Sequence, residues 1–272
     1  IEETITLCAQ RGEQREIDIA HIPKDDPDTF AMMQAADTVG VFQIESRAQM
    51  ATLPRMKPKT FYDVVIEVAI IRPGPIAGGL VHPYLNRRAG REPIDYIHPK
   101  FQPILERTLG VPLFQEQVLQ MAMVIADFSG SEAEDLRRSM SFHRSPERMA
   151  KVMAKLRAAM DSNDVEKDVQ DRIVSAIQSF ALYGFPESHA ISFGLLAYAS
   201  VWLKAHRPVE FYTALLNNQP MGFYSSATLI KDALRHGIKV YPVNIVHSQV
   251  RCTVESDHAL RLGLGQVHGL NR

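Results

Sequence analysis

Residues 131–160, SEAEDLRRSMSFHRSPERMAKVMAKLRAAM, decide the fold of this chain because they hold two helix starts separated by a short polar break. Ser131 opens a capping-box pattern, which predicts a helix that carries Arg137 and Arg138 in its second turn. Ser145-Pro146-Glu147 predicts the start of another helix, since proline is favoured at the first helical position. Two helices joined by so short a break indicate a helical protein.

Positive charge is concentrated in the same stretch. It holds seven Lys or Arg residues against four Asp or Glu residues. Adjacent helical residues lie about 100° apart, so Arg137 and Arg138 could grip one multi-anionic group from two directions. Guanidinium groups donate paired, charged hydrogen bonds to phosphate, and the helix start at Ser145 would add backbone donors. The alternative is a solvated face on which the arginines pair with nearby acids, namely Glu132, Glu134 and Glu147. Periodicity does not decide between the two.

Helical patterns continue on both sides of this stretch. Apolar periodicity and helix breakers predict further helices over residues 58–71, 101–110, 112–129, 164–183, 189–206 and 209–219. We expect Gly184 to end one helix and Ser188 to cap the next. Asp26 before Pro27 predicts another cap. The expected fold class is therefore mainly α.

Two regions depart from this helical pattern. Thr38–Ile44 is rich in β-branched and aromatic residues and predicts the one clear strand of the first half. After Pro220, short apolar runs predict three strands, with a turn at Ser256-Asp257-His258. The C-terminal segment is thus expected to be small and mixed α/β.

Composition limits the partners that the chain can bind. With 272 residues and 46% hydrophobic content, the chain can bury a core and is expected to be soluble. A formal charge of −1 gives no global attraction to nucleic acid or to an anionic membrane, so any polyanion must bind locally. No membrane span or signal peptide is expected, and the start without Met suggests a segment of a longer protein.

Metal sites are not indicated. Cys8 and Cys252 have no CxxC spacing, which excludes a zinc ribbon and fits a reducing cytoplasm. The histidines form no HxH or HExxH pattern. Asp26 and Asp28 could hold magnesium by their spacing, but helix capping around Pro27 explains them better.

Catalytic side chains are not indicated either. Glu45 and Glu116 are isolated carboxylates, so acid/base chemistry is not supported. His189 directly follows Ser188, and no aspartate stands at a spacing that would complete a triad. A capping serine and a packed histidine explain that pair more simply.

Five motifs follow one another along the chain. They are VFQIESRAQM (41–50), AIIRPGPIAGGLVHPYLNRR (69–88), LGVPLFQEQVLQMA (109–122), EAEDLRRSM (132–140) and FALYGFPESHAISF (180–193). Their order resembles the bacterial C-family DNA polymerases, the α subunits of DNA polymerase III. Together with NNQPMGFYS (217–225), FALYGFPESHA and LGVPLFQEQ are similar to the error-prone, damage-inducible paralogue, whereas the replicative enzyme usually has a YGFNKSH form.

The resemblance implies a fingers region. Residues 1–57 would be a palm-proximal segment with one strand, residues 58–218 the helical fingers core, and residues 219–272 a lead toward helix-hairpin-helix motifs. The palm's three aspartates, which bind two Mg²⁺ ions for phosphoryl transfer, would lie N-terminal of this chain. This chain alone is therefore expected to be inactive.

The resemblance also implies roles for named residues. Arg137 and Arg138 match the pair that reaches the phosphates of the incoming nucleotide, which favours phosphate binding over the solvated face. His143 and Arg144 would add to this site. The motif that closes around the nascent base pair falls on Gly184, Phe185, Ser188 and His189. The turn near the palm junction falls on Arg72, Pro73, Gly74 and Pro75. Lys151 and Lys155 are weaker candidates for contact with the DNA backbone.

The sequence departs from the family pattern after the arginine pair. The usual RRAMG and its following basic residue become Arg137-Arg-Ser-Met-Ser-Phe-His143, so Ser139 and Ser141 replace small residues and His143 replaces a lysine. A histidine is mostly neutral at pH 7, which puts the third positive charge in doubt.

Expected partners follow from the resemblance. They are primer-template DNA, the incoming deoxynucleotide and the palm of the same polypeptide. A sliding clamp and accessory mutagenesis proteins would bind through regions outside this chain. The alternatives are the fingers of the replicative α subunit, and a non-catalytic helical scaffold that binds DNA or protein.

Overall fold

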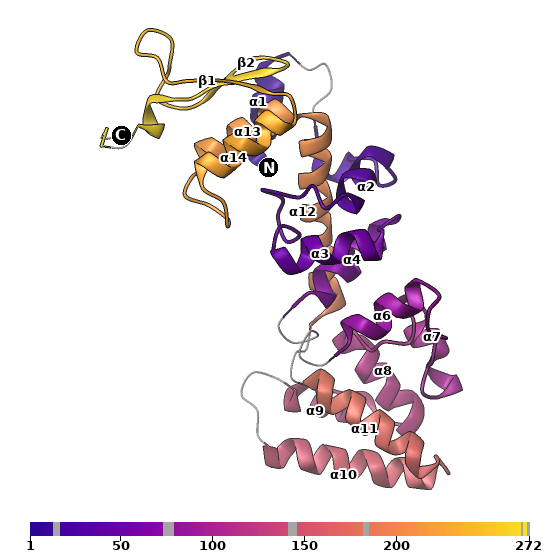
Figure 1. Cartoon of the computed structure of the whole chain (residues 1–272). Coiled ribbons are helices and arrows are strands. Elements are labelled where there is room, and N and C mark those ends of the chain that lie inside the picture. The colour runs from indigo at the N-terminus through magenta and orange to yellow at the C-terminus, as the bar shows by residue number, and fades with distance from the viewer. Residues whose placement is uncertain (13–16, 73–78, 141–145, 182–184, 268, 271–272) are drawn as a thin grey trace. The chain divides into compact units, whose positions relative to one another are not determined.

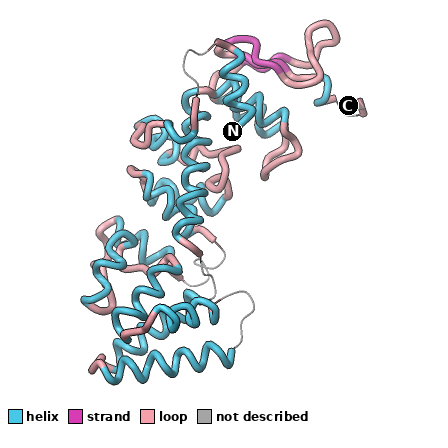
Figure 2. Tube along the Cα trace, turned by 180° about the vertical axis from the view of Figure 1, so that it is seen from behind, coloured by secondary structure: helices cyan, strands magenta, loops and turns pink. Residues whose placement is uncertain are grey.

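The structure is a computed structural model that describes residues 1–12, 17–72, 79–140, 146–181, 185–267 and 269–270. Figures 1 and 2 show a mainly helical chain whose strands are confined to its C-terminal segment, as the sequence predicts. No helix within these residues is long and apolar enough to cross a bilayer. The chain forms two compact units, residues 1–64 with 194–272 (the first unit) and residues 65–193 (the second unit). The functional segments expected from the resemblance stay a prediction.

The first unit joins the two ends of the chain. Its helices are α1 (Glu2–Gln10), α2 (Pro27–Gln34), α3 (Arg47–Met56), the start of α4 (Phe61–Ile70), most of α12 (Glu187–His206), α13 (Pro208–Asn217) and α14 (Ser226–Arg235). The almost completely buried α13 packs against both α1 and α14. Segments more than 200 residues apart in sequence therefore share one core.

A small mixed sheet covers α13 and α14. Its strands are β1 (Lys239–Tyr241), β2 (Thr253–Ser256) and β3 (Ala259–Arg261), in the order β1-β3-β2. β1 pairs in parallel with β3, with Val240 opposite Leu260, whereas β2 pairs antiparallel with β3 around a bulge. Leu260 is fully buried. The three strands and their turn confirm the prediction for the C-terminal segment.

The second unit is an all-helical body. Besides the end of α4 and the start of α12, it contains α6 (Val81–Arg88), α7 (Gln102–Leu105), α8 (Gln115–Ala126), α9 (Gly130–Ser139), α10 (Pro146–Ser162) and α11 (Lys167–Ala181). α8 packs against α9 and α10, and its apolar face is buried at Val118, Met121 and Ile125. α8 therefore lies in the core of this unit.

Asp26 caps α2 as predicted. Its carboxylate accepts the Thr29 backbone N–H at 2.8 Å, and Pro27 occupies the first helical turn. Asp28 lies exposed in that turn. The capping interpretation of this pair of aspartates is confirmed for Asp26.

Three local predictions are wrong. Thr38–Ile44 forms no strand, because Gly40 and Gln43 adopt positive φ values of 76° and 63° that interrupt an extended chain. α9 is capped by Ser129, which forms a capping box with Glu132, rather than by Ser131. Ser188 lies inside the first turn of α12, which begins at Glu187.

Candidate functional site

Arg137 and Arg138 lie in the last turn of α9 and converge on one carboxylate. Arg137 donates from Nε and Nη2 to Glu134 at 2.7 and 2.8 Å, and Arg138 donates from Nε at 2.9 Å. The two side chains are 45% and 59% exposed. Their hydrogen bonds lower the pKa of Glu134 to about 2, so this acid is ionised at neutral pH.

The geometry of Arg137 and Arg138 is compatible with both interpretations, a solvated face and a phosphate-binding site. Pairing with Glu134 is what the solvated-face interpretation expects. Convergence of two forked donors on one pair of anionic oxygens is also the geometry that phosphate binding needs. Both guanidinium groups stay exposed while they bond to Glu134, so an anion in solution can reach them. His143, Arg144 and the expected helix start at Ser145 lie outside the described residues.

Ion pairs with acids occupy most other basic side chains near α9. Lys155 pairs with Glu132, and Arg148 pairs with Asp135 at 2.9 Å. Within the described part of the chain, the exposed Lys151 forms no ion pair. Of the two lysines proposed to contact DNA, Lys151 is therefore the one not engaged by an acid.

A second cluster lies where α4 ends and α12 begins. The Arg72 guanidinium carbon is 3.7 Å from the ring centroid of Phe185, and Arg72 Nε donates to the Val68 carbonyl at 3.3 Å. The Phe185 ring meets His189 edge-on at 5.4 Å, and His189 lies 4.3 Å from Phe193. Burial lowers the pKa of Arg72 from its ordinary value. The structure brings together Arg72, Phe185 and His189, which come from two predicted motifs.

His189 is exposed, whereas Phe185 is buried. The histidine ring therefore packs on two aromatic rings while remaining accessible. The exposed Ser188 caps no helix, and its carbonyl accepts the Ser192 hydroxyl at 3.0 Å. The other predicted members of these motifs, Pro73, Gly74, Pro75 and Gly184, lie outside the described residues.

Glu116 has a role that the sequence analysis missed. Its carboxylate accepts the Glu187 backbone N–H at 2.9 Å, at the first residue of α12. The neighbouring Gln115 N–H donates to the Phe185 carbonyl at 3.1 Å. The start of α8 thus anchors the segment that presents Phe185 and His189. The only sequence signal was the position of Glu116 inside the LFQEQ motif.

The one group of acids and histidine close enough to suggest a metal, within the described residues, is filled by a lysine. Asp37, Asp232 and His236 bring ligand atoms within 4.8 Å of one another. The fully buried Lys204 ammonium lies 2.9 Å from Asp37 and 3.0 Å from Asp232. Tyr212 donates to Asp232 at 2.6 Å. Because the Lys204 ammonium already lies between the two carboxylates and pairs with both, these residues do not fit a Mg²⁺ site.

Comparison with known proteins places this chain. The family described as bacterial DNA polymerase III alpha subunit finger domain matches residues 1–164. The chain belongs to this family. A helix-hairpin-helix family matches residues 237–272, whose described part contains β1, β2 and β3. Arg72, Glu116 and the arginine pair fall within the finger-domain match, whereas Phe185 and His189 fall outside it.

Three relatives of this chain are named as error-prone DNA polymerases. It is 52% identical over 97% of its length to Error-prone DNA polymerase 1 of Agrobacterium fabrum. It is 53% identical over 98% of its length to Error-prone DNA polymerase of Alkalilimnicola ehrlichii. It is 52% identical over 97% of its length to the protein of that name in Vibrio vulnificus. The chain covers only 25 to 26% of the length of these relatives.

Proposed function

We propose that this chain is the region of an error-prone DNA polymerase that contacts the incoming nucleotide and the primer-template, in translesion synthesis and DNA repair. Family membership and the names of the relatives support the polymerase part. The arrangement of Arg137, Arg138 and Glu134 supports nucleotide contact, and carries this proposal. A triphosphate would take the place of the Glu134 carboxylate as the acceptor of the guanidinium donors.

The cluster around Phe185 would have a separate role. His189 and Phe185 would lie against the nascent base pair, and Arg72 would hold the Phe185 ring through a cation–π contact. Lys151 would meet the DNA backbone. These contacts position substrates and do not move protons.

Phosphoryl transfer itself would depend on residues outside this chain. Palm carboxylates would hold Mg²⁺ ions, which would neutralise charge on the triphosphate. We propose that the chain alone is inactive and works with the palm. A sliding clamp and accessory mutagenesis proteins would bind elsewhere on the polypeptide, in the cytoplasm.

The test uses Arg137→Ala and Arg138→Ala in the full-length polymerase. Each loss of a charge-assisted hydrogen bond is expected to cost about 1.5 to 3 kcal/mol, or about ten- to a hundredfold in nucleotide incorporation. Single-turnover kinetics over a range of deoxynucleotide concentrations measures this loss.

Arg157→Ala is the matched control. Arg157 is also on the surface of the second unit, 40% exposed, and bonds to Asp171 at 2.7 Å. Its replacement is expected to leave incorporation unchanged. Normal single-turnover rates in both Arg137→Ala and Arg138→Ala would reject nucleotide contact at this site.

A second candidate function is a helical scaffold that binds DNA or protein without contacting the nucleotide. The surface ion pairs of α9 and α10 favour it, because most of their cations already have acidic partners. In that case DNA affinity should fall steeply with salt, and the two arginine variants should weaken DNA binding at every nucleotide concentration.

A further inference from the structure

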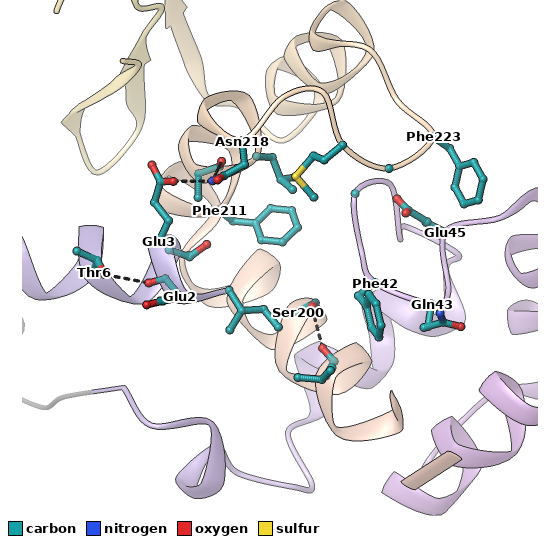
Figure 3. A pocket seen from close by; sticks show the side chains of 18 of the residues that line it. Glu2, Glu3, Thr6, Phe42, Gln43, Glu45, Ser200, Phe211, Asn218 and Phe223 are labelled. Atoms are coloured by element: carbon teal, nitrogen blue, oxygen red, sulfur yellow. Dashed lines mark hydrogen bonds between the residues drawn. The ribbon is translucent and has the colours of Figure 1, made fainter. Parts of the chain in front are cut away.

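A pocket in the first unit belongs to none of the contacts described so far. It has a volume of about 1090 Å³ and lies between α1, the segment 40–46, α13 and the segment 218–223. Figure 3 places Glu2 and Glu3 on one side, Phe42 and Glu45 on the opposite side, and Phe211 between them. A volume of this size is at the upper end of the range for binding sites in proteins.

Apolar side chains line the base of the pocket, and its rim is exposed to solvent. Phe211 and Leu215 of α13 and Leu196 of α12 contribute to the lining. At the rim, Phe223 is 77% exposed and Met221 is 42% exposed. Exposed aromatic and thioether side chains beside a hollow mark a place where another apolar group can be buried.

The wall that carries Phe223 is held in a defined position. The Tyr224 hydroxyl donates to the Glu45 backbone carbonyl at 2.7 Å, which ties segment 218–225 to segment 40–46. Gly222 has a φ of 63°, and a methyl group added there would lie 3.3 Å from Glu45 Oε1. The two segments therefore approach closely, with the Glu45 carboxyl group between them.

Among the described residues that line the pocket, no basic side chain forms an ion pair with Glu45. Burial raises the pKa of the Glu45 carboxyl, and a hydrogen bond from the Gly40 backbone acts in the opposite direction. Arg251, the basic side chain in the lining, pairs instead with Glu3 at 2.6 Å. A cation brought to Glu45 would therefore gain an ion pair in a partly buried setting.

We propose that this pocket binds a segment of a partner protein that presents an arginine or lysine next to an aromatic or branched aliphatic side chain. The apolar side chain would fill the hollow above Phe211 and Leu215. The cation would meet Glu45 at the rim, beside Phe223. Complementarity of charge to Glu45 is the reason for a basic rather than an acidic segment. The wall includes Met221, Gly222 and Phe223 of the NNQPMGFYS motif. The proposed site is separate from the proposed nucleotide contact at Arg137 and Arg138.

The test uses the full-length polymerase and two fluorescein-labelled peptides of equal length, one of five Leu-Arg repeats and one of five Leu-Glu repeats. Fluorescence anisotropy should show at least tenfold tighter binding of the Leu-Arg peptide. Glu45→Gln should weaken Leu-Arg binding at least threefold and leave Leu-Glu binding unchanged. Phe223→Ser, at an exposed site, should weaken binding of the Leu-Arg peptide as well.

Glu106→Gln, at an exposed site in the second unit, is the matched control and should change nothing. Three outcomes overturn the proposal: equal affinity for both peptides, equal effects of Glu45→Gln and Glu106→Gln, or no binding because the rest of the polypeptide covers the pocket. Arg137→Ala should not affect peptide binding, and Glu45→Gln should not affect incorporation. The pocket and the proposed nucleotide contact can therefore fail separately.

Discussion

The two units differ in where their clustered basic side chains lie, buried in the first unit and exposed in the second. In the first unit, Lys204 is completely buried and lies between two carboxylates, Asp37 and Asp232. In the second unit, Arg137 and Arg138 are exposed and share the single carboxylate of Glu134. A buried cation with two acids has no capacity left for a ligand, and its role is structural. An exposed pair of arginines remains accessible to an incoming anion.

Removal of Lys204 should have the largest effect on stability. Lys204→Met leaves Asp37 and Asp232 close together without their shared cation, and is expected to cost about 3 to 5 kcal/mol in the free energy of unfolding. Urea unfolding followed by circular dichroism measures this loss. Lys231→Met, at an exposed lysine of α14, is the control and should change stability by less than about 0.5 kcal/mol.

Asp232→Asn should recover part of this stability in the Lys204→Met background, because it removes one of the two repelling charges. The asparagine oxygen can still accept the Tyr212 hydroxyl. A double variant as unstable as Lys204→Met would show that charge is not what holds this group of residues together.

Glu67 sharpens the comparison because it is a buried acid without any cation. Glu67 is fully buried in α4, and neither of its carboxyl oxygens has a hydrogen-bond partner among the residues that the structure describes. Burial raises the pKa of Glu67 well above its ordinary value. The folded chain therefore keeps this proton at a pH where the unfolded chain releases it. Stability should fall by about 1.4 kcal/mol per pH unit between the ordinary and the raised pKa.

Glu67→Met removes the carboxyl group and conserves most of the side-chain volume. It should stabilise the chain by about 1 to 3 kcal/mol at pH 7, and by less at pH 4, where the carboxyl is neutral in both states. Thermal or urea unfolding from pH 4 to 8 measures the difference. If the difference in stability between Glu67→Met and the unchanged chain does not vary with pH, the pKa of Glu67 is the same in the folded and unfolded chain.

Glu116 should have the smallest effect, because it caps a helix rather than balancing a buried charge. Glu116→Ala removes the acceptor for the Glu187 N–H and should cost about 0.5 to 2 kcal/mol. The effect should be local and should be measurable as faster hydrogen exchange of the backbone amides in the first turn of α12. Glu116→Gln keeps an acceptor oxygen and should restore most of the protection. Equal exchange in the alanine variant and the unchanged chain would exclude the capping role.

Helix positions were largely predictable from this sequence, because periodic apolar residues and breakers such as Pro208 act locally. Thr38–Ile44 was mistaken for a strand because it is rich in β-branched and aromatic residues. Thr38, Val41 and Ile44 are fully buried, but in an irregular segment. Burial there depends on tertiary contacts, which override β-propensity.

The candidate site was predictable only in part. Resemblance of motifs indicated Arg137, Arg138, Phe185 and His189, because these residues lie in contiguous stretches. The contact of Glu116 with Glu187 joins residues 71 positions apart. The Lys204 group likewise joins residues that no local pattern connects. Such contacts depend on how the helices pack.

Binding of nucleotides with different numbers of phosphates tests the central claim most directly. The full-length polymerase, with a dideoxy-terminated primer-template, is titrated with a matching deoxynucleoside triphosphate and with the corresponding diphosphate. If Arg137 and Arg138 bind the phosphates, the unchanged enzyme should prefer the triphosphate, and the Arg137→Ala/Arg138→Ala double variant should lose most of that preference. An unchanged ratio of the two affinities in the double variant would contradict the account.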